Sequence, residues 1–101
     1  MNLKEVFEKF EDEFLKFDRI ESPLNPRPDL CAFLLLDSII PPKNNYSGKP
    51  SDMVCSAEHD EIWLDVCPRD LEKMASEEQI RDLIRCGVRY DDSVESLCMF
   101  A

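Results

Sequence analysis

The sequence predicts an α+β fold of two layers, in which a mostly antiparallel sheet carries helices packed on one face. Segments with apolar residues at helical spacing occur in pairs, and they alternate with pairs of short segments that are typical of strands. Only a few polar residues separate the strands of each pair, as in hairpins, and hairpins build antiparallel sheets. The predicted order is α-α-β-β-α-α-β-β, in a chain of 101 residues that we expect to form one domain, 1–101.

The first predicted helix begins at Leu3 and ends where Ser22-Pro23 stops it. Asn2 is the expected N-cap, with Glu5 as its capping-box partner. Its apolar side chains form one stripe, which consists of Leu3, Val6, Phe7, Phe10, Phe14 and Phe17. We expect this stripe to pack in the core, because a small domain needs its phenylalanines inside. The alternative is that the helix lies in a groove of another protein.

Three prolines between residues 23 and 28 predict a stiff, extended connector, since each biases the preceding residue away from helix. The second helix, about 28–39, is apolar on nearly all sides, which predicts a helix buried in the core. The composition of residues 41–52 predicts a loop. This loop separates a helical half, about 1–40, from an acidic αβ half, 53–101.

The acidic half begins with a predicted hairpin. Strands 53–57 and 61–66 flank Glu58-His59-Asp60, with an expected loop of three to five residues. In the second strand Ile62, Leu64 and Val66 alternate with polar residues and with Trp63, so Trp63 is expected to point away from the core.

Two helices and a second hairpin complete the chain. The short helix spans 68–75, and the next one opens with a capping box at Ser76 and Gln79 and closes at Gly87. Residues 88–90 and 95–100 are the last two predicted strands, with a turn at 91–93.

The charge is acidic and unevenly spread. The whole chain has a formal net charge of −10. Residues 1–50 hold seven Lys/Arg and nine Asp/Glu, a net of −2, whereas residues 51–101 hold five and thirteen, a net of −8. This balance argues against direct binding of nucleic acid and against an anionic membrane surface, both of which need clustered cations. It indicates instead a protein partner with a basic groove, which a DNA-mimicking surface could occupy.

The candidate residues for such a partner combine carboxylates with two aromatic side chains. They are Asp60, Glu61, Trp63, Asp65, Tyr90, Asp91, Asp92 and Glu95. The alternative use of a Trp63 and Tyr90 face is self-association, which would make the chain a homodimer or a larger structural or regulatory module.

Enzyme chemistry finds little support in the sequence. The two glycines, Gly48 and Gly87, cannot form a phosphate-binding loop, and His59 is the single histidine. Cys55, His59 and Cys67 are weak candidates for metal ligands or a thiol site, because their spacing matches no common zinc module. We therefore expect no catalytic residues, no metal and no cofactor, with a small Cys/His metal-binding or thiol protein as a further alternative.

The five cysteines are odd in number and widely spaced, which favours reduced, buried thiols over a disulfide framework. The charged start and the short apolar runs predict neither a secretory signal nor a membrane span. We therefore expect a cytoplasmic protein.

The run Ser76-Glu77-Glu78-Gln79-Ile80-Arg81-Asp82-Leu83-Ile84-Arg85-Cys86-Gly87-Val88-Arg89-Tyr90 and the ending Ser96-Leu97-Cys98-Met99-Phe100-Ala101 resemble the ends of small bacteriophage and prophage accessory proteins. The resemblance covers about the last quarter of the chain, and it assigns no activity to any residue. It implies a small acidic phage-type protein in the host cytoplasm. Such a protein is expected to inhibit or modulate a host DNA-processing or defence complex of the nuclease, helicase, restriction or CRISPR type.

Overall fold

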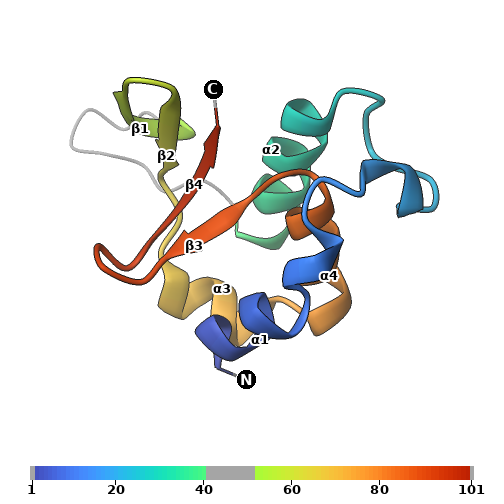
Figure 1. Cartoon of the computed structure of the whole chain (residues 1–101), viewed down its shortest axis with the longest axis horizontal. Coiled ribbons are helices and arrows are strands. Elements are labelled where there is room, and N and C mark those ends of the chain that lie inside the picture. Colours follow the sequence, from blue (N-terminus) through green and yellow to red (C-terminus); the bar gives the residue numbers. More distant parts are fainter. Residues whose placement is uncertain (1, 41–51, 101) are drawn as a thin grey trace.

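A computed structural model describes residues 2–40 and 52–100 (Figure 1). The predicted loop 41–52 lies outside these residues except for Asp52. The elements are α1 (Leu3–Lys9), the 3₁₀ turns η1 (Glu11–Glu13) and η2 (Phe17–Arg19), α2 (Pro28–Ile39), β1 (Val54–Glu58), β2 (Glu61–Leu64), α3 (Pro68–Met74), α4 (Glu77–Arg85), β3 (Arg89–Asp91) and β4 (Ser96–Phe100). This order confirms the predicted α-α-β-β-α-α-β-β arrangement.

The four strands form one antiparallel sheet in the order β1-β2-β4-β3. Each hairpin contributes two neighbouring strands, and β2 of the first hairpin pairs with β4 of the second. The helices pack on one face of this sheet (Figure 1). The predicted fold class, α+β with helices on an antiparallel sheet, is therefore confirmed.

The core lies between the helices and the inner face of the sheet. Fully buried side chains include Leu36 of α2, Leu64 of β2, Leu83 of α4 and Leu97 of β4. Alternation along each strand brings Leu64 and Leu97 to the inner face. The phenylalanine stripe packs against this core, as expected, and its members Phe7, Phe10, Phe14 and Phe17 are each partly buried.

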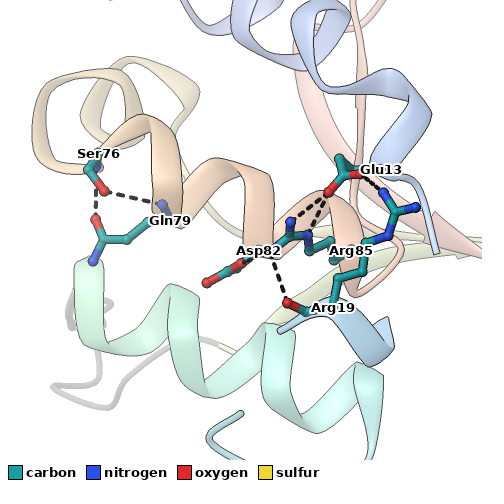
Figure 2. Close-up of polar contacts among 6 residues, drawn as sticks. All are labelled: Glu13, Arg19, Ser76, Gln79, Asp82 and Arg85. Atoms are coloured by element: carbon teal, nitrogen blue, oxygen red, sulfur yellow. Dashed lines mark hydrogen bonds and ion pairs between the residues drawn. The ribbon is translucent and has the colours of Figure 1, made fainter. Parts of the chain in front are cut away.

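The prediction of one continuous first helix is wrong, because α1 ends at Lys9. Two 3₁₀ turns follow, and Leu15 between them adopts a φ of 63°. The backbone N–H of Leu15 donates to the carbonyl oxygen of Ile84 in α4, at 3.2 Å. This irregular path turns Glu13 inward, where it meets Arg85 of α4 (Figure 2).

Helix α2 is less enclosed than its apolar composition predicts. Cys31, Ala32, Leu36 and Ile39 are buried, but Leu30 and Leu34 are 41% and 45% exposed. The prediction that α2 is a core helix therefore holds for the face that carries its buried residues, while Leu30 and Leu34 leave another part of the helix exposed among the described residues.

The two ends of α4 follow the local sequence signals. Ser76 accepts a hydrogen bond from the N–H of Gln79 at 3.1 Å, and Gln79 accepts one from the N–H of Ser76 at 2.9 Å (Figure 2). Gly87 has a φ of +102°, and the N–H groups of Gly87 and Val88 donate to Ile84 and Leu83. This pair of bonds is the Schellman closure, which needs a residue in the left-handed region.

The first hairpin is tighter than expected. Glu58 belongs to β1, so only His59 and Asp60 form the loop, and His59 takes a φ of 56°. A two-residue loop whose first residue has a positive φ matches the right-handed twist of the strands that it joins.

Candidate protein-binding surface on the sheet

The face of the sheet opposite Leu64 and Leu97 is called the outer face here, and it is defined by Glu61 and Trp63 of β2, Arg89 of β3, and Cys98 and Phe100 of β4. At one end of it the Phe100 ring contacts the ring of Phe14, between η1 and η2, with the ring centres 6.4 Å apart. Trp63 and Arg89 are both paired with Cys98, and Glu61 is paired with Phe100. Residues that pair directly across antiparallel strands point to the same face. The register alone therefore gathers these five side chains.

Arg89 reaches across the outer face from the edge strand β3 toward β2. Its guanidinium carbon lies 4.1 Å from the centre of the Phe100 ring, and its Nη2 lies 2.7 Å from Oε1 of Glu61. The Nε atom of Arg89 is buried and has no hydrogen-bond partner among the described residues. A stacked and ion-paired arginine loses less conformational freedom when a partner docks, which is typical of residues that dominate interface energies.

Trp63 and Phe100 provide the apolar part of this face. Trp63 is partly exposed and does not belong to the group packed around the core, while Phe100 is 53% exposed. Cys98, between Trp63 and Arg89 in the register, is only 1% exposed. Burial raises the pKa of its thiol, so Cys98 acts as a small apolar residue beneath its larger neighbours.

Tyr90 does not lie with Trp63. It pairs with the fully buried Leu97 on the inner face, and its ring centre is 5.9 Å from that of Phe7 in α1. The prediction of one face containing Trp63 and Tyr90 is therefore wrong. The pairing of β2 with β4 places Trp63 beside Cys98, on the opposite side from Leu97.

The predicted carboxylates fall into two groups at opposite ends of the sheet (Figure 1). Asp60 lies in the β1–β2 turn, and β2 leaves that turn beside Phe100, at the end of β4. Asp92 and Glu95 lie in the β3–β4 turn, where β4 begins. The five residues of β4 separate the groups by about 15 Å, at 3.3 Å per residue.

The carboxylates also differ in whether they already form ion pairs or hydrogen bonds within the chain. Asp92 is ion-paired with Lys4 at 3.2 Å, and Glu61 with Arg89. Asp91 accepts a hydrogen bond from the Ser93 hydroxyl at 2.6 Å, and this contact is the main cause that lowers its pKa.

Asp60 and Glu95 are exposed and form no ion pair among the residues that the structure describes. Asp65 is exposed immediately after β2, and its N–H donates to the carbonyl oxygen of Met53 at 2.7 Å. Asp60 and Glu95 are therefore the carboxylates best placed to meet a partner without first giving up a cation.

The candidate metal ligands lie apart in the structure. Cys55 is exposed in β1, where its thiol lies 3.5 Å from the carbonyl oxygen of Trp63. His59 forms the β1–β2 turn, while Cys67 is the N-cap of α3. Within residues 2–40 and 52–100, no three His, Cys, Asp or Glu side chains are grouped as a metal site.

All five cysteines are free thiols. Cys86 at the end of α4 and Cys31 of α2 are both 2% exposed. Burial, followed by the neighbouring Cys31, raises the pKa of the Cys86 thiol far above its ordinary value. A thiol that stays protonated is a poor nucleophile, so Cys86 is inert, and the buried Cys31 packs beside it in the core.

The outer face thus offers aromatic and guanidinium anchors, flanked by carboxylates at both ends of the strands. Sequence reasoning missed Arg89 and Phe100, although each alternates along its strand with a core residue, and this alternation was the available signal. Across the described segments, no helix is long and apolar enough to cross a membrane. Comparison of the chain with protein-family models, curated proteins and solved structures finds no match.

Proposed function

We propose that the chain is a non-enzymatic protein of phage type that binds a host DNA-processing or defence complex and inhibits or modulates it. The proposal is carried by the charge imbalance of the sheet. Residues 52–66 and 89–100 hold eight carboxylates and one arginine. They are Asp52, Glu58, Asp60, Glu61, Asp65, Asp91, Asp92 and Glu95, against Arg89. A surface of this sign attracts a basic groove over distances of about a Debye length, roughly 10 Å.

Nucleases, helicases, restriction enzymes and CRISPR complexes hold DNA in such grooves, because phosphate binding requires clustered Lys and Arg. Two acidic turns separated by the length of a strand can engage two basic sites of the same groove. Trp63, Arg89 and Phe100 between them supply the residue types that anchor protein interfaces. The proposal therefore combines an acidic, DNA-mimicking periphery with an aromatic centre, acting in the host cytoplasm.

Capture from a bacterial host lysate tests this function. The immobilised chain should retain a nuclease, helicase or defence complex at low salt and lose most of it at high salt, as identified by mass spectrometry. The purified complex should then lose DNA cleavage or unwinding when the chain is added. An isolated complex whose DNA processing is unaffected by a saturating amount of the chain would contradict the proposal.

A pair of matched variants locates the contact. Trp63→Ala should abolish capture, whereas Leu24→Ala should retain it, because Leu24 is an exposed apolar residue in the connector before α2 and not on the sheet. Circular dichroism of both variants confirms that the fold is intact. Equal capture by the two variants would exclude the outer face as the binding surface.

A further inference from the structure

A hollow of about 390 Å³ lies between α1 and β3, beside the outer face. Its apolar wall contains the rings of Phe7, Phe14 and Tyr90, together with Ile84 and Val88. Ile84 and Val88 are buried, while the three rings are partly buried. The hollow is therefore a preformed apolar site whose walls include aromatic faces.

Five charged residues line the same hollow, and its two cations are already engaged. Lys4 is ion-paired with Asp92, and Arg89 is ion-paired with Glu61 and stacked on a phenyl ring. Glu8 and Glu11 are the other two charged lining residues, and both are exposed. Across residues 2–40 and 52–100 neither forms an ion pair or a side-chain hydrogen bond, although Glu8 also interacts electrostatically with Lys4. Three carboxylates against two cations give the lining a net charge of −1, so the hollow carries a small excess of negative charge.

The aromatic wall is subject to the same negative field. Burial raises the pKa of the Tyr90 phenol, and the carboxylates of Glu95, Asp92 and Glu72 raise it further. A cation entering the hollow would therefore meet both aromatic rings and carboxylates.

We propose that this hollow binds an arginine side chain from a basic segment of the partner protein. A guanidinium group is planar, stacks on aromatic faces and forms bidentate contacts with carboxylates, and its alkyl stem packs against apolar side chains. The rings of Phe7 and Phe14 can stack on the guanidinium plane. The carboxylates of Glu8 and Glu11 can accept its hydrogen bonds, and the buried side chains of Ile84 and Val88 can pack against the alkyl stem. This inference rests on the proposed function for the identity of the partner as a basic protein.

A titration followed by NMR tests the site on the whole chain. The probe is a blocked Gly-Arg-Gly peptide, and its control is the same peptide with neutral citrulline in place of arginine. The arginine peptide should shift the side-chain resonances of Phe7, Phe14 and Tyr90, and the citrulline peptide should leave them unchanged. Equal shifts with both peptides, or no shift at these rings with either, would overturn the proposal.

Two double variants with the same change in net charge separate the site from the general field. Glu8→Gln/Glu11→Gln should weaken binding of the arginine peptide about tenfold, because two charged contacts of a modest strength are lost. Glu21→Gln/Asp37→Asn removes two exposed carboxylates away from the hollow and should change the affinity less than about twofold. Equal weakening of peptide binding by both variants would show that only net charge matters, and it would overturn the proposal that the hollow is the binding site.

The peptide titration and the lysate capture can fail separately. Loss of peptide binding with salt-sensitive capture intact would remove the arginine site alone. Peptide binding without any effect on DNA processing would remove the proposed function alone.

Discussion

At the scale of single residues, Gly87 controls how the chain leaves α4. Its φ of +102° lies in a region that L side chains rarely adopt, and a Cβ placed there would approach Cδ2 of Leu15 to 3.0 Å. Gly87→Ala should therefore lower the free energy of unfolding by about 1–2 kcal/mol. Urea denaturation measures this change. Asp37→Ala, at an exposed position of α2, should change it by less than about 0.5 kcal/mol.

Glu13 is a second residue with a large structural role, because it joins the irregular segment after α1 to α4. Arg85 donates to Glu13 from Nε at 2.9 Å and from Nη2 at 2.6 Å, and Arg19 forms a further ion pair with it (Figure 2). The hydrogen bond from Arg85 is the largest cause that lowers the pKa of Glu13, with burial acting in the opposite direction.

The lowered pKa makes this contact dependent on pH. A carboxyl whose pKa is lower in the folded than in the unfolded state stabilises the fold above its ordinary pKa, and this contribution is lost as the pH falls. The stability advantage of the wild type over Glu13→Gln should be complete above about pH 5 and should shrink steadily as the pH is lowered toward about 3. Urea denaturation at a series of pH values measures it. A stability difference between the wild type and Glu13→Gln that stays constant over this pH range would contradict a lowered pKa of Glu13.

At the scale of elements, the capping box is the local device that begins α4. Ser76→Ala leaves the N–H of Gln79 without its acceptor and should cost about 1 kcal/mol of stability. Ser76→Asp keeps an acceptor at the N-cap and should retain most of the stability. Thermal denaturation of the two variants compares them directly, and an equal loss in both would show that the cap contributes little.

The elements also show which signals can be read from sequence. Both ends of α4 were predictable, because Ser76, Gln79 and Gly87 act on their immediate neighbours. The early end of α1 was not, because the segment that follows it packs on α4 through Glu13 and Arg85, which are 72 residues apart along the chain. Periodicity places the phenylalanine stripe in the core, but it carries no information about a distant ion pair.

Strand pairing likewise limits how much of the candidate site can be predicted from the sequence. Alternation within β2 correctly indicated that Trp63 points away from the core. Which residues lie beside it depends on β2 pairing with β4, so Arg89 and Phe100 could not be grouped with Trp63 from the separate strands. The division of the carboxylates between two ends of the sheet has the same cause.

At the scale of the whole molecule, the cations and the carboxylates are divided unequally between the helices and the sheet. The four α-helices contain six of the twelve Lys/Arg residues, and several of these are engaged in ion pairs, such as Lys9 with Glu77 and Arg85 with Asp82. The sheet, by contrast, has Arg89 as the one cation within residues 52–66 and 89–100. Eight of the thirteen carboxylates of the acidic half therefore lie in or beside the sheet, and three exposed ones, Asp60, Asp92 and Glu95, lie in its two turns.

The most direct test of this account is the affinity of the captured host complex for Asp60→Lys/Glu95→Lys, compared with the wild type over increasing salt. Both carboxylates are exposed and make no ion pair among the described residues, so their reversal should leave the fold intact. The account predicts that the wild-type affinity falls by at least about tenfold between low and high salt, and that the variant binds weakly with little salt dependence. A variant that binds as tightly as the wild type, with the same dependence on salt, would contradict it.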